Sequence, residues 1–128
     1  MPAKPSPPPT EDALERVRRV CLALPEAFEQ EAWGAPTFRV RKRIFAMFAA
    51  AGKHHGRGRD GLWLAAPLGV QEIVVRADSD KFFVPPYVGV KGWIGANVDA
   101  VDDGELRSLA VQAYCMLAPK KLQALVAG

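Results

Sequence analysis

The sequence predicts an α+β domain built as a two-layer sandwich, in which N-terminal and C-terminal helices pack on one face of an antiparallel sheet. Three observations support this class. Apolar residues recur at helical spacing near both ends of the chain, and the middle of the chain alternates as strands do. The connections between the expected strands are too short for parallel crossovers. Helices flanking a run of antiparallel strands are typical of a sheet covered by helices on one side.

The first element is a helix predicted over residues 11–24. Thr10 is placed to cap its start, and Glu11 and Asp12 suit the positive end of the helix dipole. Pro25 is expected to end it. The residues on its apolar side are Leu14, Val17, Val20, Cys21 and Leu24.

Strands follow, because the spacing of apolar residues changes after Phe28. The turn between the first two is predicted at Gly34-Ala35-Pro36, and the tip between the second and third at Arg41-Lys42-Arg43. A Gly-, Arg- and His-rich loop over residues 52–61 leads into the fourth. The predicted strands are residues 29–33, 37–40, 44–50, 62–66 and 92–98.

Residues 67–77 fit either a short amphipathic helix or a strand. The run Ile73-Val74-Val75 is β-branched enough for a strand, but Gln71-Glu72 and Ala77-Asp78 are poor strand residues, so we predict a helix. Near the C-terminus, Asp103 is placed to cap a helix that continues through Leu117. Pro119 is expected to begin a last helical segment with Leu122, Leu125 and Val126 facing inward.

The length of 128 residues, 49% of them hydrophobic, fits one domain over residues 10–128. Residues 1–9 include five prolines and offer almost nothing to bury, so we expect a disordered Pro-rich tail. No run approaches the ~18 apolar residues of a membrane span, and no apolar signal core is present. We therefore expect a cytoplasmic protein without membrane contact, and we favour a monomer slightly over an oligomer.

Basic residues are concentrated in one block of the sequence. Residues 32–59 carry seven basic side chains and no acidic one, whereas the rest of the chain carries ten basic and fourteen acidic side chains. Such a block attracts polyanions if its side chains converge on one face, although many basic blocks are simply solvated. Our first hypothesis is therefore DNA binding through phosphate contacts from neighbouring hairpin tips, made by Arg39, Arg41, Lys42, Arg43, Lys53, Arg57 and Arg59.

Aromatic residues gather in a second segment, residues 80–93. Pro85-Pro86 excludes a helix or a central strand there, so a loop of fixed shape is expected. That loop could carry function or could simply plug one end of the core. The alternative hypothesis is a small-molecule or protein interaction module, because pockets favour aromatic side chains. The residues expected to line its pocket are Trp33, Trp63, Phe82, Phe83, Tyr87 and Trp93.

Several other motifs are not expected to carry chemistry. Residues 56–61 have the spacing Gly-x-Gly-x-x-Gly, but a strand rather than a helix is predicted after them, so no dinucleotide site is expected. His54-His55 lacks further ligands at metal spacing. Cys21 and Cys115 are expected to be buried, reduced thiols. No catalytic site, metal or cofactor is predicted.

Several segments carry a resemblance to a known family. They are Leu24-Pro25-Glu26-Ala27-Phe28-Glu29, Trp33-Gly34-Ala35-Pro36-Thr37-Phe38-Arg39-Val40, Lys42-Arg43-Ile44-Phe45-Ala46-Met47, Phe82-Phe83-Val84-Pro85-Pro86-Tyr87-Val88-Gly89, Gly92-Trp93-Ile94-Gly95, Ala113-Tyr114 and Ala118-Pro119-Lys120-Lys121-Leu122. In this order and at this spacing, over about residues 11–126, the chain resembles the MmcQ/YjbR family.

The resemblance implies a CyaY/frataxin-like sandwich with a double-wing arrangement, in a family usually described as DNA-binding. The wings would be residues 39–45 and residues 53–60. Many members carry an Asn-Lys pair and a His before the equivalent tryptophan, whereas this chain has Gly89-Val90-Lys91-Gly92. Lys91 is therefore the basic group retained there, and it joins the candidate phosphate contacts.

Overall fold

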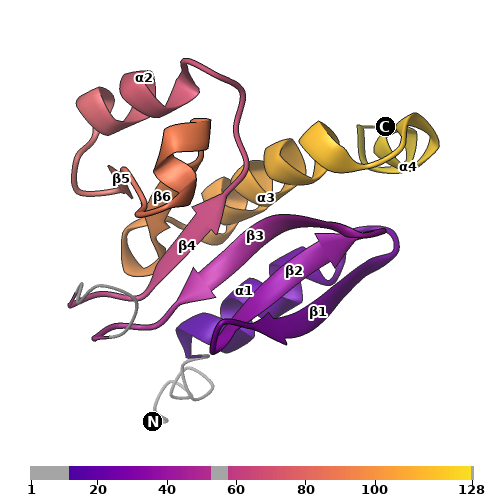
Figure 1. Ribbon diagram of the computed structural model, residues 1–128, viewed down its shortest axis with the longest axis horizontal. Coiled ribbons are helices and arrows are strands. Elements are labelled where there is room, and N and C mark those ends of the chain that lie inside the picture. The colour runs from indigo at the N-terminus through magenta and orange to yellow at the C-terminus, as the bar shows by residue number, and fades with distance from the viewer. Residues whose placement is uncertain (1–11, 53–57, 128) are drawn as a thin grey trace, which may run out of the picture.

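The computed structural model describes residues 12–52 and 58–127, and within them six strands form one antiparallel sheet (Figure 1). Its strand order is β1-β2-β3-β4-β6-β5, so β4 joins the first half of the sheet to the second. The strands are β1 (Ala27–Ala32), β2 (Ala35–Val40), β3 (Arg43–Ala49), β4 (Gly61–Leu64), β5 (Phe82–Phe83) and β6 (Ile94–Asn97).

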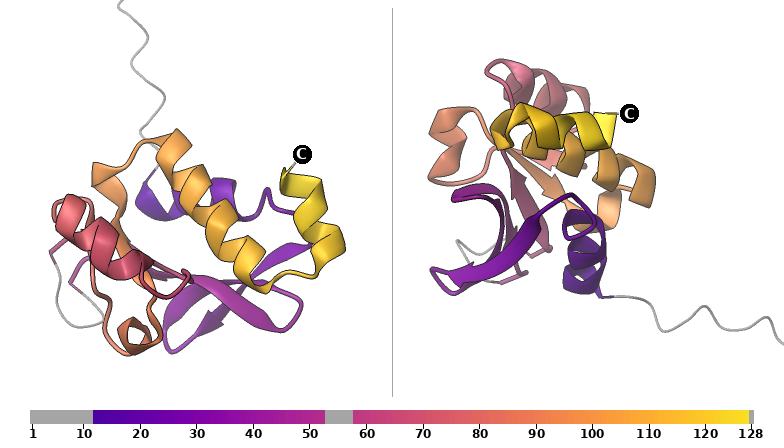
Figure 2. Two further views of the ribbon diagram at one scale, coloured as in Figure 1. Left: turned by 90° about the horizontal axis from the view of Figure 1, so that it is seen from above. Right: turned by 90° about the vertical axis from the view of Figure 1, so that its right-hand side faces the viewer.

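The helices α1 (Ala13–Cys21), α3 (Asp103–Leu117) and α4 (Lys120–Ala127) gather on one side of the strands (Figure 2). The helix α2 (Val70–Ala77) lies beside the short strand β5 at the edge of the sheet (Figure 1). Two single-turn 3-10 helices, η1 (Val88–Lys91) and η2 (Val98–Ala100), flank β6. The predicted α+β sandwich, with terminal helices on one face of an antiparallel sheet, is confirmed.

The main core lies between these helices and the sheet. Burial of apolar side chains from both layers removes them from water and holds the layers together. Phe45 of β3 and Tyr114 of α3 meet edge to face, with ring centroids 5.6 Å apart. The Tyr114 hydroxyl also donates a hydrogen bond to the Pro25 carbonyl at 2.7 Å, which fixes the chain between α1 and β1. Fully buried members of this core include Val17, Val40, Leu62, Leu64 and Leu106.

The residues that cap α1 and α3 differ from the predicted ones. Asp12 caps α1 and Asp102 caps α3, and each forms a capping box with the glutamate three residues later. Asp103, which we predicted as a cap, instead lies in the first turn and pairs with Arg16 at 2.7 Å. The prediction was wrong because Asp102 and Asp103 both suit the position, and only Asp102 has a glutamate at the required spacing. Thr10 lies outside the described residues.

The boundaries of all five predicted strands differ by one or two residues. The first turn is Trp33-Gly34, and Pro36 lies inside β2, where the register gives it no partner on β3. A proline without a partner on that side removes no ladder hydrogen bond. The strand predicted to begin at Gly92 begins at Ile94, and β4 ends at Leu64. The helix predicted over residues 67–77 is confirmed as α2, because Val70 and Val74 pack against the core at helical spacing.

The second face of the sheet carries a smaller apolar cluster that includes Phe83 of β5. We predicted this segment as loop, but Phe83 pairs with Gly95 of β6, and its ring covers the glycine. A Cβ atom added at Gly95 would lie 2.3 Å from that ring, closer than real side chains approach. The other members of the cluster are Ala35, Met47, Ala49 and Trp63, with Val88 and Trp93 packed against it.

Candidate functional site

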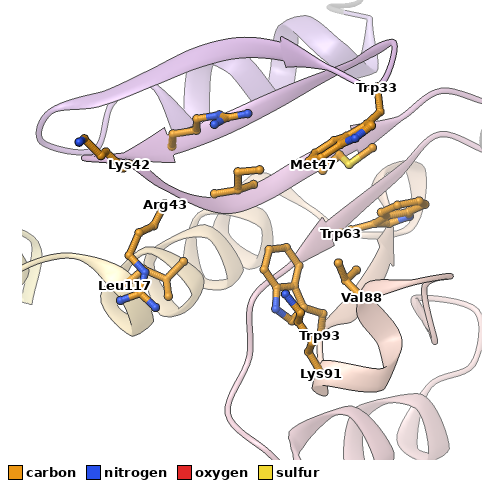
Figure 3. Close-up of a pocket in the computed structure, with 11 residues that line it drawn as sticks. Trp33, Lys42, Arg43, Met47, Trp63, Val88, Lys91, Trp93 and Leu117 are labelled. Atoms are coloured by element: carbon orange, nitrogen blue, oxygen red, sulfur yellow. The ribbon is translucent and has the colours of Figure 1, made fainter.

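A pocket of about 490 Å³ lies on this second face, where β3 and the β2–β3 hairpin extend past the end of β4 (Figure 3). Its size is within the ~300–1,000 Å³ of ordinary ligand pockets. Side chains from the β1–β2 turn, the β2–β3 hairpin, β4, the η1 segment and the end of α3 meet there. The residues that line it are Trp33, Arg39, Lys42, Arg43, Ile44, Met47, Trp63, Val88, Lys91, Trp93 and Leu117.

The floor of the pocket is apolar. Met47 of β3 and Trp63 of β4 are cross-strand partners and therefore point to the same face of the sheet. Both are buried, with 2% of Trp63 exposed. The register of β2 against β3 shifts between Phe38 and Arg39, where Phe45 of β3 is an extra, unpaired residue, so that Arg39 comes to lie opposite Ile44 on this face.

The walls of the pocket are cationic. Arg39 comes from β2, Lys42 from the β2–β3 turn, Arg43 from the start of β3 and Lys91 from the end of η1. The Arg39 Nε donates a hydrogen bond to Thr37 Oγ1 at 3.0 Å, and Thr37 in turn donates to the Gln30 carbonyl, so this guanidinium is held in place. Among the described residues, no carboxylate lines the pocket.

These four cations also have no acidic partner in the rest of the described chain. Within residues 12–52 and 58–127, no ion pair involves Arg39, Lys42, Arg43 or Lys91. Charges of one sign facing an apolar, water-poor floor raise the local concentration of anions. The pocket is therefore a positively charged site with aromatic and aliphatic surface at its base.

The segment around η1 shapes the opposite wall. The Val88 amide donates to the Pro86 carbonyl at 2.6 Å, and Tyr87 between them has φ 61° and ψ −70°. This is a γ-turn of the rare, strained form. The Gln71 Nε2 of α2 donates to the carbonyls of Gly89 at 2.9 Å and Trp93 at 2.6 Å. The aromatic loop thus both packs on the sheet and lines the pocket, and α2 fixes its shape.

The other predicted cations lie elsewhere. Arg41 lies in the same β2–β3 turn as Lys42, but it pairs with Glu26 at 3.0 Å and is not part of the lining. Arg59 pairs with Asp80 at 2.9 Å and with Asp99 at 2.7 Å. The hydrogen bonds that Arg59 donates to Asp99 and then to Asp80 raise the pKa of its guanidinium, because they stabilise the charged form.

The two basic tips do not form one face in the described residues, because consecutive turns of an antiparallel meander lie at opposite ends of the shared strand. The turn holding Lys42 lies at the start of β3, and the connection leading to Arg59 begins at its end. Lys53, His54, His55 and Arg57 lie outside the described residues.

The predicted aromatic set divides in two. Trp33, Trp63 and Trp93 line the pocket together. Phe82 packs against the main core and Phe83 lies over Gly95, so neither is available to a ligand in the pocket. Tyr87, 71% exposed, points outside the lining.

Sequence reasoning treated the basic block and the aromatic cluster as rival sites, and the structure brings parts of both together. It missed Ile44, Met47, Val88 and Leu117 as lining residues. Ile44 and Met47 are three residues apart and share a face only because Phe45 is an extra residue in β3, which simple alternation along residues 44–50 does not reveal. Without that register, the sequence held no signal that would join these residues to Trp63.

The described part of the chain does not support metal binding or thiol chemistry. Residues 12–52 and 58–127 contain no group of three His, Cys, Asp or Glu side chains placed to hold a metal ion. Burial raises the pKa of the Cys21 thiol to about 12 and also raises the pKa of the Cys115 thiol, so both resist forming the reactive thiolate. None of the described helices has the length and apolar content needed to cross a membrane.

Comparison with known proteins gives a family and a fold. A model of the YjbR family matches residues 22–116, which is more than half of the chain. A crystal structure of Deinococcus radiodurans protein DR2400, with a DUF419 domain, is similar at a TM-score of 0.65 and 19% identity, covering 80% of this chain and 76% of that chain. At this identity the likeness concerns the fold alone. No curated protein matches the chain.

Proposed function

This chain belongs to the YjbR family, and we propose that it binds DNA through backbone phosphates held by Arg39, Lys42, Arg43 and Lys91. The observation that supports this function is the pocket lining itself, in which these four cations meet without a carboxylate among the described residues. In this proposal the β2–β3 hairpin supplies most of the charge, and Lys91 supplies the opposite wall.

Phosphate recognition suits these side chains. An arginine guanidinium donates two parallel hydrogen bonds to phosphate oxygens, and a lysine ammonium acts as a compact charge on a flexible stem. Neutralising phosphates also releases condensed counterions, which favours binding without any sequence readout. The exposed Lys42, Arg43 and Lys91 can reach a backbone that lies along the pocket rim.

Binding, rather than catalysis, is proposed for this pocket. Its lining residues include no Asp, Glu, His, Cys, Ser or Thr side chain among those described. Those are the usual general acids, bases and nucleophiles of enzymes. The tryptophans and cations that are present hold a ligand in place without transferring a proton or forming a bond to it.

Titration of the protein with a fluorescently labelled DNA duplex at two salt concentrations tests the proposal. Binding is expected at about 50 mM salt and should weaken steeply as salt is raised, because the interaction is electrostatic. The double variant Lys42→Ala/Arg43→Ala should lose most of the affinity. Arg59→Ala is the matched control, because Arg59 is already paired and lies at the other end of β3. Equal losses in both variants, or no binding of any nucleic acid at low salt, would contradict the proposal.

A second candidate function is a small-molecule or protein interaction module that uses the same pocket. The apolar floor of Met47 and Trp63 and the volume of about 490 Å³ favour it. Quenching of tryptophan fluorescence by free anionic metabolites, in the absence of any DNA binding, would support this function in place of the first.

A further inference from the structure

Trp33 occupies a backbone position that a tryptophan does not favour. It forms the two-residue connection between β1 and β2 with Gly34, and the flanking Ala32 and Ala35 are paired. Trp33 has φ 54° and Gly34 has φ 74°. Two successive positive φ values are the pattern of a type I′ hairpin turn, in which Asn-Gly is strongly preferred. A bulky residue at positive φ is uncommon, so turn geometry does not explain the tryptophan.

Core packing does not explain Trp33 either, because 74% of the residue is exposed. Isolated exposed apolar residues are normal on protein surfaces. Trp33 is different because it stands at the rim of the charged pocket, at the β1–β2 turn and beside Met47 (Figure 3). A backbone conformation that the residue type disfavours, and that core packing does not explain, indicates a functional position.

A second indole stands across the pocket from Trp33. Trp93 is half-buried, and its carbonyl accepts a hydrogen bond from Gln71, so α2 holds it in place. Figure 3 shows Trp93 and Lys91 on the η1 side of the pocket and Trp33 beside Met47 on the opposite side. The buried Trp63 forms the floor and presents little surface to a ligand.

Accessible indoles and unpaired cations in one pocket match the chemistry of an unpaired nucleotide. Indole rings stack on the face of any base, and cations hold the adjoining phosphates. In a duplex the base faces are already stacked on one another and are not available to a side chain at the rim. A single strand offers both base faces and phosphates.

We infer that the pocket selects single-stranded nucleic acid over duplex, with Trp33 and Trp93 stacking on bases while Arg39, Lys42, Arg43 and Lys91 hold the phosphates. This inference rests on the proposed function and specifies the form of nucleic acid that the site takes. Because every base has a stacking face, little sequence preference is expected.

Anisotropy titrations with a dT oligonucleotide of about 12 nucleotides, a U oligonucleotide of the same length and a mixed-sequence duplex test the inference, since ~4–16 nucleotides is the usual site size. Single strands should bind more tightly than the duplex. The DNA and RNA arms show whether the sugar matters. Free thymidine monophosphate is a fourth probe, and it should bind far more weakly than the oligonucleotide.

The variant that isolates stacking is Trp33→Asn, because asparagine suits the turn. It should weaken single-strand binding by roughly 5- to 150-fold, which is the loss of one stacked base, and leave duplex binding nearly unchanged. Leu125→Asn is the control, since Leu125 is also a large exposed apolar residue but lies on α4, outside the lining. It should bind single strands as the unmodified protein does.

The outcomes separate the two proposals. If the duplex binds as tightly as the single strand, or if Trp33→Asn has no effect, the single-strand inference fails and phosphate binding stands. If monophosphate binds as tightly as the oligonucleotide, the pocket is a small-molecule site and the inference fails. If no nucleic acid binds at about 50 mM salt, the proposed function fails and the inference fails with it.

Discussion

Gly95 of β6 lies beneath the ring of Phe83, and this contact holds the η1 side of the pocket against the sheet. A methyl group there would meet three ring atoms at 2.3–2.6 Å, and the ring is itself buried. We expect Gly95→Ala to lower the free energy of unfolding by about 1–3 kcal/mol through overpacking.

Urea denaturation measures this change. Gly58→Ala is the control, because an added Cβ at Gly58 would have nothing within 4 Å. A Gly95→Ala protein as stable as the Gly58→Ala protein would show that Phe83 is free to move away from the sheet.

The buried thiol of Cys21 predicts a pH dependence. Burial raises its pKa to about 12, whereas an unfolded thiol titrates near ~8.5. Above ~8.5 the unfolded chain loses this proton and the folded chain keeps it, so stability falls as pH rises, by up to about 1.4 kcal/mol per unit.

Unfolding measured at about pH 7.5 and about pH 9.5 should therefore show a larger loss for the unmodified protein than for Cys21→Ala, which has no thiol at this position. Lysine and tyrosine titrations affect both proteins and cancel in the comparison. Equal pH slopes would mean that the Cys21 thiol ionises as readily in the folded state as in the unfolded chain.

Among single residues, the sequence identified the right cations for the pocket but could not separate them from the rest. Arg39, Lys42 and Arg43 stood beside Arg41 and Arg59 in one basic block. What divides them is pairing with Glu26, Asp80 and Asp99, which are distant in sequence. Long-range ion pairs have no local signature, so only the fold could make this division.

The caps of the helices show how an element depends on one side chain. Asp102 Oδ1 accepts a hydrogen bond from the Glu105 amide at 2.8 Å at the start of α3. Asp102→Ala should cost about 1 kcal/mol of stability, because the amide loses its partner. Asp102→Asn should cost much less, since asparagine caps nearly as well. Thermal unfolding compares the three proteins, and equal losses for Ala and Asn would contradict the cap.

At the β1–β2 turn we expect a substitution to raise stability rather than lower it. Trp33→Asn places a favoured residue at positive φ and removes little buried surface. We therefore expect this variant to be more stable by about 1 kcal/mol while it loses single-strand binding. Denaturation and binding measured on the same preparation test the gain in stability and the loss of single-strand binding. A variant that is both less stable and weaker in binding would point to a structural role for the indole.

Element types were largely predictable, and boundaries were not. The helix α2 followed from the spacing of Val70 and Val74. The strand β5 was missed because two residues, Phe82 and Phe83, are too short to show any alternation. Its presence depends on the edge of β6 and on glycine at position 95, neither of which is visible locally.

At the scale of the whole molecule, the four pocket cations predict a salt dependence. If each neutralises one phosphate of a single strand, the slope of log K against log salt should be about −2.8. Lys42→Ala should reduce its magnitude by about 0.7, and Arg59→Ala should leave it unchanged. Titrations at several salt concentrations measure the slopes. A slope near zero would exclude phosphate contacts as the source of affinity.

The overall architecture was predictable because three sequence patterns predict the same fold. They are helical spacing at the ends of the chain, alternation between them, and short connections. The site was only half predictable. Its cations and tryptophans were all named and its aliphatic residues were missed, and the joining of Trp33, Trp63 and Trp93 with the hairpin cations depends on strand order and on the register shift beside Arg39.

The central place of β4 in the sheet also has a consequence for synthesis on the ribosome. The strands β1 to β3, with Trp33 and Arg43, emerge long before Trp93 and β6, and at ~5–20 residues per second the interval lasts several seconds. Before β6 is synthesised, β4 with Trp63 has no neighbouring strand on that side. The apolar side of α1 stays uncovered until α3 has been synthesised. A nascent chain therefore presents the cations of the β2–β3 hairpin before Trp93 exists, and both indoles of the proposed stacking site are present only once translation has passed Trp93.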